Sequence, residues 1–270
     1  MPTDGPPAVS PTGETGRSAA AAEIFVLDIV IPVYNEGSNI LKVLQALDAA
    51  VATPARVLIC YDRDDDDTLT TIAEHWPHGR LPIVFVRNQG KGAHGAVMTG
   101  LLAGATPYAL MYPGDDDYNA GILDSMVAKA REGNDIICAS RFMRGGSMVG
   151  CPWLKAFLVR AAATILFHFA DVVTHDPTNG FRLFSRRVIE QIKVESTQGF
   201  TYSLELLVKA QRLRWDIAEV PARWFERSAG RSRFRVLRWI PAYLRWVLYA
   251  FGTAYGRLPP ASVALNRKAP

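Results

Sequence analysis

Two hydrophobic patterns alternate along residues 25–142, and this alternation constrains the fold more than any other feature of the sequence. One pattern is short, continuously apolar and rich in β-branched residues, as in strands buried on both faces of a sheet; it occurs at residues 25–34, 55–62, 81–88, 107–113 and 135–142. The other has apolar residues at helical spacing; it occurs between the strands, at residues 35–51, 68–76, 92–105 and 121–133. Strict alternation predicts an α/β fold in which a doubly wound, mainly parallel sheet carries helices on both faces.

Polar clusters follow the ends of the predicted strands. They read NEGSN, DRDDDDT, NQGKG, GDDDYN and SRFMRGG, and they begin at residues 35, 62, 88, 114 and 140. The carboxyl ends of parallel strands meet at one edge of a sheet, and ligands bind in the crevice outside that edge. The sequence therefore predicts one binding site assembled from these clusters.

The pattern changes after Gly150. A long apolar helix is expected over residues 151–170, then a turn, a short strand and a helix over 174–192, a helix over 200–213 and a strand over 215–226. We divide the chain into a disordered tail (1–23), one globular domain (24–235), an amphipathic helix (236–258) and a second tail (259–270). The first tail is rich in Pro, Gly, Ser and Thr and lacks the apolar core of a signal peptide.

Charge and cysteine usage exclude some classes of protein. The net charge is +4 with a pI of about 9.0, which matters only where the cations cluster, as the arginines do over residues 223–238. A nucleic-acid partner is not expected, because the acidic edge of the sheet would repel phosphates. An odd number of cysteines without metal-like spacing indicates reduced thiols in a cytosolic chain, with Cys60 and Cys138 packed in strands.

Three consecutive aspartates, Asp115 to Asp117, end the apolar stretch 107–113. Like charges crowded at a strand end repel one another unless a cation lies beside them. Carboxylate oxygens suit Mg²⁺ or Mn²⁺, which proteins hold with one or two carboxylates plus substrate phosphates. A solvated turn or a helix cap is the alternative. Because the three aspartates lie at the expected ligand edge, we favour a metal site over a solvated turn or a cap.

Two further clusters suggest contacts with a nucleotide. Asp62 leaves the second strand and can accept hydrogen bonds from a base or from ribose hydroxyls, whereas Asp66 and Asp67 are explained by capping the next helix. Lys91 lies among glycines that open a helix, where backbone N–H groups and the helix dipole attract anions. The glycine spacing matches neither a Walker A loop nor a dinucleotide fingerprint, and an ordinary strand–helix turn also needs glycine.

The order of these motifs from Leu27 to Ser232 resembles the family-two inverting glycosyltransferases. The sequence is most similar to the branch of dolichol-phosphate mannose synthases and polyprenyl-phosphate sugar synthases. The motifs that carry the resemblance are VIPVYNEGSNI, D-x-x-x-D-x-T, N-x-G-K-G, GDDDYN, SRF, DPTNGFRLFSR and EVPARWFERSAGRS. The resemblance implies a GT-A fold over residues 24–235, a nucleotide-sugar donor (UDP- or GDP-sugar) and a divalent metal, Mg²⁺ or Mn²⁺.

The resemblance assigns the metal and the donor site, with one departure. The family's metal motif, Asp-x-Asp-x-Gln, places its first Asp on Pro113 in one register, while a shifted register makes Asp115 and Asp117 the pair. Both registers use Asp115 and Asp117, which we predict as metal ligands. The predicted donor-binding residues are Pro32, Tyr34, Glu36, Asp62, Lys91, Asp115, Arg227 and Ser232. Arg227 would also act in catalysis, by stabilising the leaving diphosphate.

The same resemblance places the acceptor beside Arg141, with Arg160 or Lys155 as a second contact; both arginines could instead pair with nearby carboxylates. A polyprenyl-phosphate acceptor brings its own anionic oxygen and needs no strong base. A hydroxyl acceptor needs one, and Asp176 is the first catalytic candidate, with Glu205 second. An Asx-turn before a proline is the alternative role for Asp176.

The leading hypothesis is a metal-dependent inverting glycosyltransferase with a polyprenyl-phosphate acceptor. The alternatives are a soluble glycosyltransferase that acts on a sugar or small-molecule hydroxyl, and an inactive nucleotide-sugar-binding partner of a membrane complex. The basic, aromatic segment 236–258 suits the surface of a membrane, so we expect a cytoplasmic protein peripheral to its inner face. A helix that packs back on the domain would have the same sequence pattern. The sequence does not predict the oligomeric state.

Overall fold

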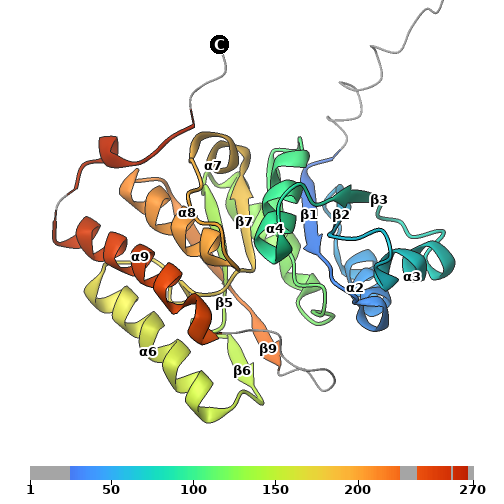
Figure 1. Ribbon diagram of the computed structural model, residues 1–270, viewed down its shortest axis with the longest axis horizontal. Coiled ribbons are helices and arrows are strands. Elements are labelled where there is room, and N and C mark those ends of the chain that lie inside the picture. The colour runs from blue at the N-terminus through green and yellow to red at the C-terminus, as the bar shows by residue number, and fades with distance from the viewer. Residues whose placement is uncertain (1–24, 226–235, 257, 267–270) are drawn as a thin grey trace, which may run out of the picture.

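The structure is a computed structural model of the 270-residue chain, and it describes residues 25–225, 236–256 and 258–266. The predicted tail 1–23 lies outside the described residues. The described part confirms the expected α/β architecture (Figure 1).

One large sheet runs through the domain in the order β3-β2-β1-β4-β7-β5-β8. Its strands are β1 (Leu27–Pro32), β2 (Ala55–Tyr61), β3 (Ile83–Arg87), β4 (Tyr108–Met111), β5 (Ile136–Ser140), β7 (Arg182–Ser185) and β8 (Ile217–Pro221). β1 pairs parallel with β2 and β4, β2 with β3, and β5 with β8. All the polar clusters after these parallel strands therefore meet at one edge.

β7 is the exception, because it runs antiparallel between β4 and β5. The chain leaves β5 at the ligand edge, passes through α6 (Trp153–Phe169) and returns to the same edge before it enters β7. This path places the segment before β7, which contains Asp176, beside the segment after β5, which contains Arg141.

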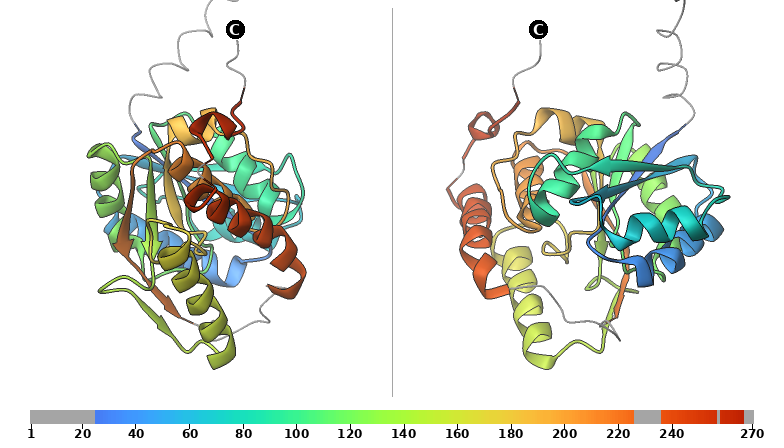
Figure 2. Two further views of the ribbon diagram at one scale, coloured as in Figure 1. Left: turned by 90° about the vertical axis from the view of Figure 1, so that its left-hand side faces the viewer. Right: turned by 45° about the vertical axis from the view of Figure 1, so that its right-hand side comes forward.

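Helices cover both faces of the sheet (Figure 2). On one face α2 (Gly37–Ala50), α3 (Asp67–His75) and α5 (Leu123–Arg131), which follows the short 3₁₀-helix η1 (Ala120–Ile122), pack in one buried apolar cluster. On the other, α4 (Gly92–Ala103), α7 (Arg186–Gln191) and α8 (Thr201–Arg212) pack in a second cluster. Cys60 and Cys138 are fully buried in β2 and β5, as expected, and burial raises the pKa of the Cys60 thiol to about 12.

The predicted strand 215–226 is divided in two. β8 ends at Pro221, and β9 (Arg223–Phe225) pairs instead with β6 (Ser147–Val149), so that a two-stranded ribbon projects from the main sheet (Figures 1 and 2). The sequence does not predict β6, because three residues among glycines carry no measurable period. Pro221 lacks an N–H to continue the ladder, which suits the end of β8.

The C-terminal segment folds onto the domain. α9 (Val236–Ala254) lies beside α8 and α6 (Figure 1), and its Trp246 is 1% exposed against α8. The described part of the expected second tail is also attached: η2 (Pro260–Ser262) is followed by a bridge from Leu265 to Ile192. None of the described helices is long and apolar enough to cross a membrane.

Candidate active site

The loop after β1 is held by the N-terminus of α3. The backbone N–H of Asn35 donates to Asp66 Oδ2 over 3.0 Å, and that of Glu36 donates to Thr68 Oγ1 over 3.0 Å. Asn35 has φ of 52°, a left-handed conformation that asparagine tolerates better than most residues. Asp66 also caps α3 through Thr68 N, the capping role expected from the sequence. The loop thus presents Tyr34, 47% exposed, at the ligand edge, next to Pro32 at the end of β1.

Asn88 connects Asp62, a predicted donor contact, to the glycine loop that contains Lys91. Its Nδ2 donates to Asp62 Oδ1 and to the carbonyl of Gly92, and its Oδ1 accepts from Gly90 N over 2.7 Å. A Cβ on Gly95 would lie 2.8 Å from the Gly90 carbonyl carbon, so the glycine loop closes only with glycine there. Lys91 is exposed as the N-cap residue of α4. Asn88 opens the N-x-G-K-G motif, but the motif alone does not predict that its side chain bonds to Asp62.

Asp116 builds the turn after β4. It is 6% exposed and accepts hydrogen bonds from Asn119 N at 2.9 Å, from Asn119 Nδ2 at 2.6 Å and from Tyr118 N at 3.2 Å. Burial disfavours the charged carboxylate and raises the pKa of Asp116 to about 6, although these donors oppose the shift. Asp116 is therefore a structural residue of the turn, and its neighbours are the ones left for ligands.

Asp115 and Asp117 flank this anchor. Asp115 is half-buried and Asp117 is exposed. In the part of the chain that the structure describes, no group of three or more His, Cys, Asp or Glu side chains could hold a metal ion. A pair of carboxylates that is completed by phosphate oxygens is a common arrangement for Mg²⁺ and Mn²⁺, so these two residues fit a metal that arrives with a nucleotide diphosphate.

Asn119 ties this turn to the β6–β9 ribbon. Its Nδ2 donates to the carbonyl of Arg223 at 2.8 Å, and its Oδ1 accepts from Arg223 N at 2.9 Å. The rings of Tyr118 and Phe225 meet edge to face, with centroids 4.6 Å apart. β9 leads directly into residues 226–235, which include the predicted donor contacts Arg227 and Ser232 and lie outside the described residues. Sequence reasoning did not identify Asn119 as the link.

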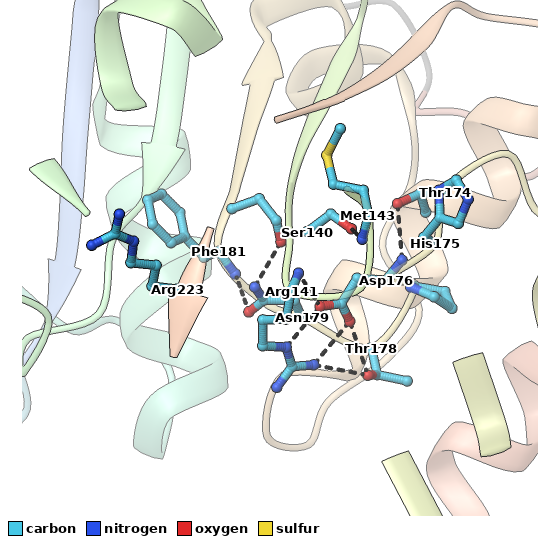
Figure 3. A network of polar contacts seen from close by, with 12 residues as sticks. Ser140, Arg141, Met143, Thr174, His175, Asp176, Thr178, Asn179, Phe181 and Arg223 are labelled. Atoms are coloured by element: carbon cyan, nitrogen blue, oxygen red, sulfur yellow. Dashed lines mark hydrogen bonds and ion pairs between the residues drawn. The ribbon is translucent and has the colours of Figure 1, made fainter. Parts of the chain in front are cut away.

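Arg141 and Asp176 form a two-pronged ion pair (Figure 3). Arg141 Nε lies 2.7 Å from Asp176 Oδ2 and its Nη2 lies 2.8 Å from Oδ1, while Arg141 N also donates to Oδ2 at 3.0 Å. The Asp176 side chain is fully buried and that of Arg141 is 11% exposed. Such bidentate pairs are strong and geometrically specific. Both residues, predicted for the acceptor and for a base, are engaged with each other.

Arg182 fixes the backbone beneath Asp176. Its guanidinium is fully buried and donates to the carbonyls of Pro177 at 2.6 Å and Asp176 at 3.2 Å, and to that of Ser203 in α8. Asn179 Nδ2 also donates to the carbonyl of Ala139 in β5 at 2.7 Å. The segment before β7 is thus attached to β5 and to α8, and sequence reasoning missed both supports.

The other predicted acceptor contacts lie on α6. The Arg160 guanidinium carbon is 5.3 Å from the centre of the Phe142 ring, and that of Arg141 is 5.1 Å from the same ring. Lys155 Nζ is 4.8 Å from the Trp224 ring of β9. Phe142, which directly follows Arg141, therefore connects the ion pair to α6 through cation–π contacts.

Glu205, the second candidate for a base, lies elsewhere. It is fully buried in α8, where its carboxylate accepts from Glu195 N, Ser196 N and Lys209 Nζ at 2.6–2.8 Å. Lys209, also fully buried, lies over the Trp246 ring of α9 at 5.1 Å. These contacts give Glu205 a structural role between α8, the segment 193–196 and α9.

Comparison with known proteins decides the family. The model of "Glycosyl transferase family 2" matches residues 28–193. The chain belongs to glycosyltransferase family 2. Family membership accounts for the motif order and for the strand-end clusters, and it agrees with the resemblance seen in the sequence.

Two curated proteins are similar to most of this chain. A dolichol-phosphate mannosyltransferase of Pyrococcus furiosus is 23% identical over 231 residues, which cover 82% of this chain and 64% of that protein. A polyprenol monophosphomannose synthase of Mycolicibacterium smegmatis is 26% identical over 212 residues, 76% of this chain and 79% of that protein. The chain thus spans less than two thirds of the first relative.

A solved structure shows the same GT-A fold. Glucosyl-3-phosphoglycerate synthase of Mycobacterium tuberculosis, crystallised with Mn²⁺, UDP and glucosyl-3-phosphoglycerate, has a TM-score of 0.58 and 17% sequence identity. The match covers 93% of this chain and 87% of that chain. At this identity the likeness establishes the fold alone.

Proposed function

We propose that the protein is a metal-dependent inverting glycosyltransferase that moves a sugar from a nucleotide-sugar donor to a polyprenyl phosphate. The acceptor assignment rests on one observation, the burial of Asp176 in its ion pair with Arg141. Its two carboxylate oxygens accept from Arg141 and its side chain is fully buried, so it is not placed to remove a proton from a hydroxyl. An acceptor phosphate needs no such base, because its oxygen is already anionic.

The donor would bind across β1, β2, β3 and β4. The diphosphate would lie next to Asp115 and Asp117, which would hold the metal, and the base and ribose would lie along Tyr34, Glu36 and Asp62, with Lys91 close to the anion. The structural neighbour crystallised with Mn²⁺ and UDP supports a divalent ion and a nucleoside diphosphate as ligands. The metal, Mg²⁺ or Mn²⁺, supplies Lewis acidity and neutralises charge on the leaving diphosphate. Arg227 would add a cation to the same oxygens.

The acceptor would lie on the β5 side of the edge. Arg160 and Lys155 on α6 bring two cations there, and Arg141 orients the loop through Asp176. Holding the acceptor oxygen in line with the anomeric carbon, opposite the leaving group, inverts the configuration at that carbon and lowers the entropic barrier. The names of both curated relatives, which refer to dolichol phosphate and polyprenol phosphate, support this acceptor class.

A lipid acceptor requires contact with a membrane, and α6 offers a surface for it. Six of its large apolar side chains are 45–79% exposed: Trp153, Leu154, Phe157, Leu158, Ile165 and Phe169. α6 contains no acidic residue, and Lys155 and Arg160 lie among these side chains. Aromatic, apolar and basic residues together suit the headgroup boundary of an anionic membrane. We therefore place the peripheral contact, expected from α9 in the sequence, mainly on α6, at the cytoplasmic face.

Two assays test this function in sequence. Thermal shift with UDP- and GDP-sugars, with and without Mn²⁺, identifies the donor, because a bound ligand stabilises the folded state by mass action. Transfer of the radiolabelled sugar to a polyprenyl phosphate in detergent then tests the acceptor. A donor that transfers only to soluble sugars or small alcohols would replace the lipid acceptor by the hydroxyl alternative. A donor that binds and is neither hydrolysed nor transferred would identify an inactive partner.

A further inference from the structure

A cavity of about 220 Å³ lies between α6 and the segments that follow β5 and precede β7. Its polar lining comes from Arg160, Thr164, His168 and His175, and its apolar lining includes Phe142 and Phe167. Among the described residues that line it, none is acidic. Small-molecule pockets usually enclose ~300–1,000 Å³, so this cavity suits one headgroup and is too small for a nucleotide sugar.

His175 is held in a fixed orientation at this cavity. Its Nδ1 contacts Glu219 Oε1, and the other Glu219 oxygen accepts from His175 N at 3.0 Å and from Thr174 Oγ1 at 2.8 Å. The imidazole stacks on the Phe167 ring with centroids 4.3 Å apart and planes 23° apart. Glu219 lies in β8, and its side chain is only 14% exposed. The Glu219 carboxylate accepts the hydrogen bond from the Nδ1–H, which leaves Nε2 as the ring nitrogen that can meet a ligand.

We propose that His175, positioned by Glu219, binds a phosphomonoester in this cavity together with Arg160 and His168. With the Glu219 carboxylate accepting at Nδ1, a phosphate oxygen would accept a hydrogen bond from Nε2. The proposal rests on the proposed function for its link to the acceptor, because Arg141, the other predicted phosphate contact, is committed to Asp176. No local sequence pattern selects His175, since its partner Glu219 lies 44 residues further along the chain, in β8.

Phosphate binding itself can be measured without any transfer reaction. Titration of the full-length protein with inorganic phosphate, followed by calorimetry, should show binding that weakens about tenfold or more in His175→Gln, the usual effect of losing a hydrogen bond to a charged group. Arg160→Gln, a second exposed position, should weaken binding similarly. The control is His78→Gln, an exposed histidine after α3. Equal affinity in the wild-type protein and in both cavity variants would overturn the proposal, as would an equal loss in the control.

Glu219 is tested by a graded pair of variants. Glu219→Gln keeps an oxygen that accepts from Nδ1 and loses the charge, whereas Glu219→Ala loses both. Phosphate affinity should therefore fall in the order wild type, Glu219→Gln, Glu219→Ala, with donor affinity unchanged in all three. Donor and phosphate affinities that fall together would show that Glu219 only supports the fold, and would overturn its positioning role.

Assays with two different acceptors distinguish a lipid phosphate from a soluble phosphate as the ligand of this cavity. A short-chain polyprenyl phosphate in micelles and glycerol 3-phosphate carry the same phosphomonoester. The acceptor that is used should have a KM that rises in His175→Gln while kcat changes little. If neither accepts sugar but phosphate binding still depends on His175, the proposed function fails and the phosphate site stands. If one accepts sugar with an unchanged KM in His175→Gln, the function stands and the link to the cavity fails.

Discussion

The three aspartates after β4 differ in burial and in their hydrogen bonds. Asp116 points inward and holds the turn through Asn119 and Tyr118, while Asp115 and Asp117 stay at the edge. One buried carboxylate with three N–H partners and two carboxylates nearer to solvent thus share one short turn. A cation bound between Asp115 and Asp117 would relieve the like-charge repulsion at the edge.

Substitutions in this turn should separate binding from folding. Asp115→Asn and Asp117→Asn should abolish Mn²⁺-dependent donor binding, and the melting temperature of the metal-free protein should stay level or rise, since repulsion falls. Asp116→Ala should instead cost about 1–3 kcal/mol of unfolding free energy, because it leaves buried donors unpaired. Calorimetry of donor binding and thermal denaturation measure the two effects. Normal metal-dependent binding in both Asn variants would place the metal elsewhere.

Asp176 gives a test of the acceptor at the residue scale. Asp176→Asn should reduce kcat only moderately with a phosphate acceptor, because the acceptor oxygen brings its own charge. If Asp176 were a general base, the loss would be about 10²–10⁴-fold. The control is Asp171→Asn, an exposed aspartate at φ of 50°, where asparagine is tolerated. A loss of the larger size in a protein that remains folded would contradict the phosphate acceptor.

At the scale of elements, the hydrophobic pattern of the sequence correctly predicted the strands and helices that have a clear period. The strands from β1 to β5 and the helices between them were foreseen, because each has a clear period and a polar cluster at its end. The antiparallel insertion of β7, the division of β8 from β9 and the pairing of Arg141 with Asp176 were not predicted as such. These features depend on contacts between residues far apart in the chain, and no local pattern records them.

α9 illustrates the same limit. Its amphipathic pattern, with aromatic and basic residues, fits both a membrane surface and a protein surface. The structure buries Trp246 against α8 and places Lys209 over its ring. Since this contact lies in the second apolar cluster, the inner face of α9 belongs to the domain, whereas Leu244 and Leu248 remain half or more exposed.

Removing the anchor of α9 should destabilise the whole domain. Trp246→Ala should lower the free energy of unfolding by about 3–5 kcal/mol, the usual cost of truncating a buried tryptophan. Trp153→Ala, on α6 and 79% exposed, is the matched control and should change it by less than about 0.5 kcal/mol. Denaturant titration measures both. A similar small change in the two variants would show that α9 is detachable, as a helix reserved for the membrane would be.

On the scale of the whole molecule, the two halves of the sheet edge carry different sets of charged side chains. The half formed by β2, β1 and β4 presents Asp62, Asp115 and Asp117, and the half beyond β7 is next to the cations of α6. A metal–nucleotide complex suits the first half and an acceptor phosphate suits the second. α6 carries the exposed apolar side chains at the second half, so membrane contact and acceptor site would lie on one side of the molecule.

This arrangement predicts how the protein meets a membrane. The full-length protein should sediment with anionic vesicles at low salt and less at high salt, as ions screen the attraction of Lys155 and Arg160. The double variant Phe157→Ser with Leu158→Ser should reduce partitioning more than tenfold, because each buried apolar side chain contributes about 1.5–3 kcal/mol. Phe85→Ser, 45% exposed on β3 at the far edge of the sheet, is the control and should bind vesicles as the wild type does.

Wild-type protein that does not bind vesicles at low salt would remove the membrane from the proposed function. A double variant that partitions normally would move the contact from α6 to another surface.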